Sequence, residues 1–256
     1  VSSNILENMH IIIGPLYANN FRILCERYGN DITKILISPL SKNILNVKKN
    51  KSVYQISPSF SIQTNIIMKY VLKNHKDDRV IVLNQKGFEG KSTYIKNMFT
   101  QNGKEVEIFS VIYTKVDSIR KMFNAKQVVI IPSDNKAFVS KILGSIGGLD
   151  STSFIFGLYD WKKYDNLDIH NLMFLDVKFP DPYFYCNIGY YDTSFDNLFQ
   201  KKYNTSKERY TDVGYNIIMH FCSNFSLFKF QNINEGGKIN SNCPLHHYVN
   251  YELVPL

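Results

Sequence analysis

The 256-residue sequence lacks a long hydrophobic run, and this limits how it can relate to a membrane. A membrane-spanning helix needs about 18 or more apolar residues in a row, and no stretch reaches that length. The first residues also lack the basic and apolar pattern of a signal peptide. We therefore expect no membrane span. Because Val1 is not a natural initiator, we expect the sequence to be a fragment or a trimmed product.

Signature motifs of common enzymes are also missing. No GxSxG, HExxH or GxGxxG occurs, and the six histidines follow no partner pattern. The stretch KGFEGKST (86–93) has the end of a phosphate loop, GxxxxGK[ST]. The first glycine of that motif is replaced by Gln85. We therefore predict that the protein is not an enzyme.

Cysteine is scarce, which bears on metal sites and disulfides. The four cysteines are Cys25, Cys186, Cys222 and Cys243. They form no CxxC pair and no Cys/His spacing typical of zinc, so we expect no metal and no cofactor. Free or buried thiols are the simpler interpretation, and a Cys222–Cys243 disulfide stays open in an oxidising compartment.

Positive charge and apolar side chains, by contrast, are plentiful. The formal net charge is +8, and 44% of the residues are hydrophobic. A basic balance favours nucleic acids or anionic surfaces as partners. The densest basic patch is only VKKNKSVY (47–54), so we predict no nucleic-acid partner. The length and apolar content are sufficient for two hydrophobic cores.

Short apolar runs alternate with amphipathic stretches along most of the sequence. The expected strands are 9–16, 34–40, 53–59, 79–85, 104–112, 126–134, 152–161 and 172–179. The expected helices are 19–29, 61–75 with Ser61 as its cap, 90–103, 116–124 and 136–149. Strands that alternate with helices in this way indicate βαβ units and parallel sheets. Two consecutive series predict an α/β fold with two lobes, each a parallel sheet flanked by helices.

The ends of these strands are the places to look for a ligand. In open α/β sheets, ligands bind beyond the carboxyl ends of the strands. The expected ends are 15–20, 38–41, 57–59, 84–89, 132–135 and 158–161. They are rich in Ser, Asn, Asp and aromatic residues, which is typical of a binding site and equally of ordinary surface loops.

Several of these stretches, in this order, resemble one known family. The motifs are IIIGPLYANN (11–20), ILISPLS (35–41), VYQISPSFSIQ (53–63), RVIVLNQKGFEGKSTYIKNMFTQNGKEV (79–106) and FDNLFQKKYNTSKERYTDVGYNIIMHF (195–221). Together they resemble the type I periplasmic-binding-protein family, the two-lobed receptors of the leucine/isoleucine/valine-binding kind. The resemblance covers essentially the whole sequence.

The resemblance implies a division into two Rossmann-like lobes. The first lobe would comprise 1–71 and 183–229, and the second 72–182 and 230–256. Hinges would lie near 57–61, 179–187 and 229–231. The family normally has a strand and a helix before the Gly14-Pro15 motif, so we expect the first βα unit to be missing here.

The resemblance also implies a function. It predicts a non-catalytic solute-binding protein, periplasmic or otherwise extracytoplasmic, that holds an amino acid or peptide between its lobes and works with a membrane transporter. The alternative is a degenerate interaction module of the cell envelope without a small ligand. That module would be peptidoglycan-associated or synthase-activating, like family versions fused to LysM modules. YANN (17–20) and Asn216 depart from the family's usual residues and favour this alternative.

The residues that would contact the ligand follow from the same resemblance. They are Tyr17, Ala18, Asn19, Ser38, Ser41 and Ser59 in the first lobe, and Tyr159, Asp160 and Trp161 in the second. Hydroxyl and amide groups would bind the ligand's carboxylate. Asp160 would pair with its ammonium group.

Overall fold

A computed structural model shows two compact units in the chain. It describes residues 4–112, 119–120, 123, 126–147, 152–164, 166–182, 193–207, 209–223 and 225–256. Unit 1 comprises Val1–Ile62 and Pro182–Cys243, and unit 2 comprises Gln63–Asp181 and Pro244–Leu256. The chain crosses between the units after Ile62, after Asp181 and after Cys243.

Unit 1 is built on a five-stranded sheet. Its strand order is β1 (Ile11–Ile13), β2 (Ile35–Ser38), β3 (Val53–Gln55), β10 (Lys238–Asn240) and β9 (Phe230–Asn232). The first four strands are parallel, and β9 is antiparallel to β10. The helical elements of this part of the chain are η1 (Asn4–Asn8), α1 (Ala18–Tyr28), α2 (Leu45–Lys49), α7 (Thr193–Tyr203) and α8 (Arg209–Cys222).

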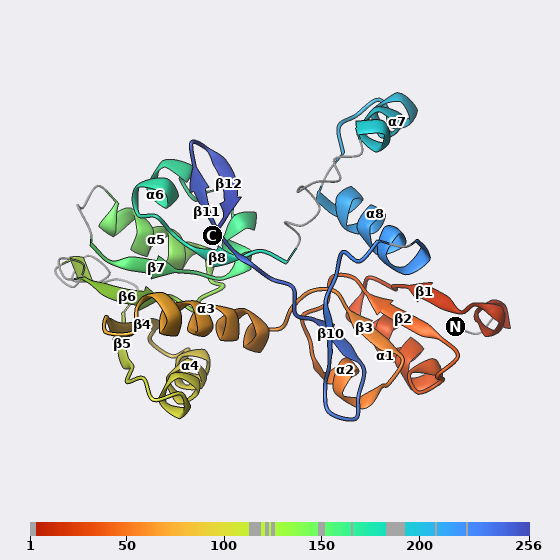
Figure 1. Ribbon diagram of the computed structural model, residues 1–256, viewed down its shortest axis with the longest axis horizontal. Coiled ribbons are helices and arrows are strands. Elements are labelled where there is room, and N and C mark those ends of the chain that lie inside the picture. Colours follow the sequence, from red (N-terminus) through yellow and green to blue (C-terminus); the bar gives the residue numbers. More distant parts are fainter. Residues whose placement is uncertain are drawn as a thin grey trace. The chain divides into compact units, whose positions relative to one another are not determined.

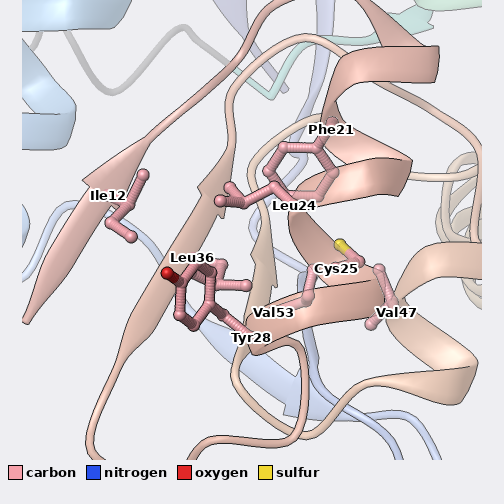
Figure 2. Close-up of a cluster of buried hydrophobic side chains, with 8 residues drawn as sticks. All are labelled: Ile12, Phe21, Leu24, Cys25, Tyr28, Leu36, Val47 and Val53. Atoms are coloured by element: carbon pink, nitrogen blue, oxygen red, sulfur yellow. The ribbon is translucent and has the colours of Figure 1, made fainter. Parts of the chain in front are cut away.

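The core of unit 1 lies between α1 and the sheet. Phe21, Leu24, Cys25 and Tyr28 recur at the spacing of one helical face, and all four are buried. Figure 2 shows these side chains of α1 together with Ile12 of β1, Leu36 of β2, Val53 of β3 and Val47 of α2. The apolar face of α1 therefore fixes the helix on the sheet, as the sequence pattern predicted.

Unit 2 contains a four-stranded sheet whose strands are all parallel. Its order is β5 (Glu107–Val111), β4 (Arg79–Gln85), β6 (Gln127–Ile130) and β7 (Phe154–Phe156). Its helical elements include α3 (Phe60–Asn74, which starts before the crossing), α4 (Glu89–Gln101), α5 (Lys136–Ile146), η3 (Tyr159–Lys163) and α6 (Ile169–Phe174). A second, antiparallel sheet has the order β12 (Glu252–Pro255), β11 (Leu245–Val249) and β8 (Phe179–Pro180).

The α/β fold with parallel sheets flanked by helices is confirmed. The unit boundaries differ from those that the resemblance implied, 71 and 229. Strand β10 pairs with β3, and β9 pairs with β10, so the segment 230–243 stays with unit 1. The chain therefore crosses after Cys243 and not near 229–231.

Two predicted strands need correction. The expected strand 172–179 is wrong, because Asp168 caps α6 by accepting a hydrogen bond from the His170 backbone N–H at 2.9 Å. Of that stretch, only Phe179 belongs to a strand, β8. The expected strand 152–161 ends at Phe156, and its last residues form η3. The expected helix 116–124 lies largely outside the described residues.

The cap of α3 also differs from the prediction. The helix begins at Phe60, so Ser61 is already inside it. Ser59 precedes the helix, and its Oγ accepts a hydrogen bond from the Ile62 backbone N–H at 3.4 Å. A serine in this position satisfies one of the backbone donors that a helix start leaves unpaired.

The described cysteines form no disulfide with one another. Cys25, Cys222 and Cys243 are free, so the Cys222–Cys243 disulfide that the sequence left open is not formed. Cys186 lies outside the described residues. Within the described ranges, no group of three or more His, Cys, Asp or Glu side chains could hold a metal ion. The helices in those ranges are each too short or too polar to cross a membrane.

Candidate functional site

The parallel sheet of unit 2 changes winding direction between β4 and β6. From β4 the chain moves to β5 on one side, and from β6 it moves to β7 on the other side. Right-handed crossovers therefore carry α4 and α5 over opposite faces, and Figure 1 shows the two helices on either side of this sheet. The carboxyl ends of β4 and β6 lie next to each other at this switch point, where open α/β sheets bind their ligands.

A cavity of about 250 Å³ lies at this switch point. It is lined by Leu83, Asn84, Gln85, Phe88, Gly90, Lys91, Pro132, Ser133, Asp134 and Asn135. These residues are the end of β4, the start of α4 and the segment between β6 and α5. Seven of them belong to two of the predicted strand ends, 84–89 and 132–135, while Leu83, Gly90 and Lys91 lie just outside these ranges. The stretch that failed as a phosphate loop thus forms one side of the cavity.

An ion pair crosses the rim of the cavity. Lys91 Nζ lies 2.8 Å from Asp134 Oδ2; the Lys91 side chain is partly exposed and that of Asp134 is exposed. A pair close to solvent contributes only about 0–1 kcal/mol to stability. A ligand group can therefore compete for either charge of this pair.

Hydrogen bonds fix the floor of the cavity. Asn84 accepts a hydrogen bond from Ser92 Oγ at 2.9 Å and donates one to the Gln85 carbonyl at 2.8 Å. The neighbouring Gln85 Oε1 is buried and has no hydrogen-bond partner among the described residues. An unpaired buried acceptor is costly, so Gln85 offers a site for a ligand donor. Phe88, which is 63% exposed, adds an aromatic surface beside these polar groups.

The opposite wall is held from behind by residues 159–164. Trp161 Nε1 donates to the Ser133 carbonyl at 2.8 Å, and Tyr164 Oη donates to the Asp134 carbonyl at 2.5 Å. Burial, with the nearby charges of Asp160 and Asp134, raises the pKa of Tyr164 to about 12, so the phenol stays protonated and donates. The wall is therefore fixed through the backbone carbonyls of Ser133 and Asp134, and both residues line the cavity.

The second-lobe residues named from the sequence lie behind this wall. Tyr159 and Trp161 are only 2% and 1% exposed, and the Tyr159 backbone N–H donates to Gln63 Oε1 at 3.1 Å. Asp160 Oδ1 accepts from Lys163 Nζ at 3.0 Å. None of the three lines the cavity.

The first-lobe residues named from the sequence gather at the carboxyl edge of the unit 1 sheet. Tyr17, Ala18 and Asn19 form the start of α1, directly after β1, and Tyr17 is 79% exposed. Ser38 is the buried last residue of β2, and the Gly14 N–H bonds to the neighbouring Ile37 carbonyl at 2.9 Å.

The segments with Ser41 and Ser59 follow β2 and β3 at the same carboxyl edge. Ser57 Oγ donates to the Pro39 carbonyl at 3.4 Å, which places the turn before Ser59 beside β2. Ser41 Oγ accepts from the Asn43 backbone N–H at 3.2 Å. The turn into α1 requires glycine at position 14, where φ is +85°. Unit 1 thus collects its predicted residues along one edge.

Solved structures share the fold of this chain. A leucine binding protein, LivK from Thermotoga maritima, matches over 98% of this chain and 79% of its own, with 16% identity and a TM-score of 0.58. An ABC transporter substrate-binding protein from Desulfitobacterium hafniense matches over 96% of this chain and 80% of its own, with 12% identity and a TM-score of 0.63. The chain has the type I periplasmic-binding-protein fold.

This fold also occurs in a structure of a different kind. LpoA from Haemophilus influenzae matches over 99% of this chain with 9% identity and a TM-score of 0.60, and the chain spans 49% of LpoA. No protein-family model and no curated protein sequence matches the chain. The type I periplasmic-binding-protein fold is therefore what these likenesses share with the chain.

Proposed function

We propose that the protein is a non-catalytic, extracytoplasmic solute-binding protein whose ligand is an amino acid or a small peptide. The observation that supports this most directly is the cavity at the switch point of unit 2, with charges of both signs at its rim. The likeness to a leucine binding protein and to an ABC transporter substrate-binding protein supports the same class of ligand and a membrane transporter as partner.

The cavity suits a zwitterion. Asp134 is a partner for an ammonium group, and Lys91 is a partner for a carboxylate. Gln85 Oε1 is a further acceptor for the ammonium group, and Phe88 covers an apolar side chain. Ligand pockets commonly measure about 300–1,000 Å³, so about 250 Å³ favours a small solute.

The first-lobe contacts are a separate part of the proposal. We keep Tyr17, Ala18, Asn19, Ser38, Ser41 and Ser59 as candidate ligand contacts of unit 1. Asn19 lies in the first turn of α1, and Ser38 is the last residue of β2. In the second lobe, Tyr159, Asp160 and Trp161 stay candidates from the resemblance, and Trp161 in addition supports the cavity wall through its bond to the Ser133 carbonyl.

A second candidate function is an interaction module of the cell envelope that binds a protein or polymer and no small solute. The likeness to LpoA favours it, and so does the net charge of +8. The two candidates differ in one property, which is whether a small zwitterion binds.

Thermal unfolding in the presence of amino acids and dipeptides separates the candidates. A solute at 100 times its Kd stabilises by about 2.7 kcal/mol. For a chain of this size, that corresponds to a rise in Tm of about 5–10 °C. If no solute raises Tm while the protein captures an envelope protein in a defined binding assay, the solute-binding proposal is wrong and the alternative holds.

A further inference from the structure

The segment from Trp161 to Tyr164 contacts the cavity wall at two successive carbonyls. Trp161 Nε1 reaches the carbonyl of Ser133, and Tyr164 Oη reaches that of Asp134. Both carbonyls belong to the stretch between β6 and α5 that lines the cavity. A movement of this stretch therefore either breaks both hydrogen bonds or displaces Trp161 and Tyr164 with it.

The segment is itself held tightly, so it transmits such a movement. Its turn is closed by backbone hydrogen bonds from Trp161 N–H to Leu158 O and from Tyr164 N–H to Trp161 O, each at 3.0 Å. The Trp161 ring packs against Gly157, where an added Cβ would lie 2.5 Å from it. A close-packed ring has little room to move alone.

The same segment reaches the place where the chain enters and leaves unit 2. Lys162 Nζ lies 2.6 Å from Asp181 Oδ2, and Asp181 is 0% exposed. The Asp181 backbone N–H donates to the Pro244 carbonyl at 2.9 Å. Asp181 is the last residue of unit 2 before one crossing, and Pro244 is the first residue after another.

A buried carboxylate keeps its cation close. Separating a buried carboxylate from a cation paired with it is strongly unfavourable. A displacement of Asp181 therefore displaces Lys162. Trp161 and Tyr164 belong to the same hydrogen-bonded turn, so they are displaced with it. The contacts form one continuous path from the cavity wall to the two crossings.

We propose that residues 161–164 are positioning residues that couple the cavity wall to the crossing segments at Asp181 and Pro244. Given the proposed function, a solute that shifts Ser133 and Asp134 also shifts the crossings. By thermodynamic reciprocity, a change at the crossings alters the affinity of the cavity by the same factor. The coupling is a property of the free protein as well, so it can be tested without a ligand.

The first test removes both charges of the pair, with Lys162→Met/Asp181→Leu, so that no buried charge is left unpaired. Amide hydrogen exchange is measured at residues 133–135 relative to the core amides of β4 in the same variant. We expect the ratio to rise about ten-fold over wild type. The matched control is Lys178→Met/Asp176→Asn, which removes another buried lysine's ion pair away from the wall. The control is expected to leave the ratio unchanged.

The second test runs in the opposite direction and uses a milder change. Tyr164→Phe deletes only the hydroxyl that bonds to the Asp134 carbonyl. We expect exchange of the Asp181 amide to rise several-fold, again relative to the β4 core. This variant keeps the proposal testable if the double variant does not fold.

The outcomes are distinct. An unchanged ratio at 133–135 in a folded double variant, or an unchanged Asp181 amide in Tyr164→Phe, overturns the coupling. A ratio that rises equally in the control variant overturns it too, because the effect is then general loosening. A failure to find a solute overturns the proposed function and leaves these exchange results standing.

Discussion

Gly157 stands at a position that has no room for a side chain. A Cβ at this position would lie 2.5 Å from the Trp161 ring, closer than real contacts allow. Trp161 is the single tryptophan of the chain, and its indole supports the cavity wall. The absence of a side chain at Gly157 therefore lets the Trp161 ring take the position from which it bonds to the cavity wall.

Gly157→Ala is expected to displace the Trp161 ring and destabilise unit 2 by about 1–3 kcal/mol, the usual cost of overpacking. Urea unfolding measures the loss, and a red shift of the single-tryptophan emission reports exposure of the ring. Gly144→Ala is the control. Gly144 lies inside α5 with open space around it, so alanine there should stabilise by about 0.5–1 kcal/mol. Equal stability of both variants contradicts the packing around Trp161.

His246 makes stability depend on pH. It is buried, and burial lowers its pKa to about 4, while Asp181 favours the charged form, and Lys162 and His247 disfavour it. Because the folded pKa is below the unfolded value of about 6.5, the unfolded state binds more protons between these two values. The stability contribution of neutral His246 is therefore present above pH 6.5 and is lost as the pH falls toward 4.

Replacing this histidine tests that sign. Between pH 6.5 and 4, wild type should lose up to about 1.4 kcal/mol per pH unit more than His246→Gln does. The measurement is urea unfolding of both proteins across that range. His247→Gln, which changes a more exposed neighbour, is the control. A variant with the same pH slope as wild type shows that His246 does not titrate in this way.

Helix α1 illustrates what periodicity predicts well. Leu24 is 1% exposed and points into the core of unit 1, whereas its neighbour Ile23 is 43% exposed (Figure 2 shows Leu24). Leu24→Ala should therefore cost about 2–5 kcal/mol through lost burial and the cavity left behind. Ile23→Ala should cost less than about 1 kcal/mol. Similar losses in chemical unfolding for the two variants contradict the assigned face of α1.

Elements with clear periodicity or β-branched runs were predictable from the sequence, and shorter ones were not. The strand 79–85 was predicted at the observed bounds of β4, because residues 80–83 (VIVL) form a continuous apolar run, largely β-branched, between polar segments. LMFLDVKF (172–179) is apolar without a clear period, so the cap at Asp168 decided its structure. Its first residues are helical for that reason.

The length of β7 could not be predicted from the sequence. The apolar run predicts a strand over 152–161, with Tyr159, Asp160 and Trp161 at its end. Strand β7 ends at Phe156, and a 3-10 turn then folds Trp161 into the core. A shift of this kind depends on tertiary packing around Gly157, which local sequence patterns do not encode. The strand ends at 84–89 and 132–135, by contrast, were predictable because both follow strongly β-branched runs.

At the scale of the whole molecule, the order of elements specifies the fold. The alternation of strands and helices predicted parallel sheets, and the collinear motifs implied the type I periplasmic-binding-protein fold that the solved structures share. The segment 230–243 shows the limit of that approach. Its pairing with β3 joins residues that are far apart in the sequence, so only the folded chain reveals it.

The central claim is that the switch-point cavity of unit 2 binds a small zwitterion through Lys91 and Asp134. The most direct measurement is calorimetric titration with the amino acid or dipeptide that most raises Tm. Wild type is compared with Lys91→Met, with Asp134→Asn and with the control Lys96→Met on the same helix. We predict saturable binding to wild type and to the control, and a loss of affinity of about ten-fold or more in each cavity variant. Equal affinity in all four proteins, or no binding heat from any amino acid or dipeptide, would contradict the claim.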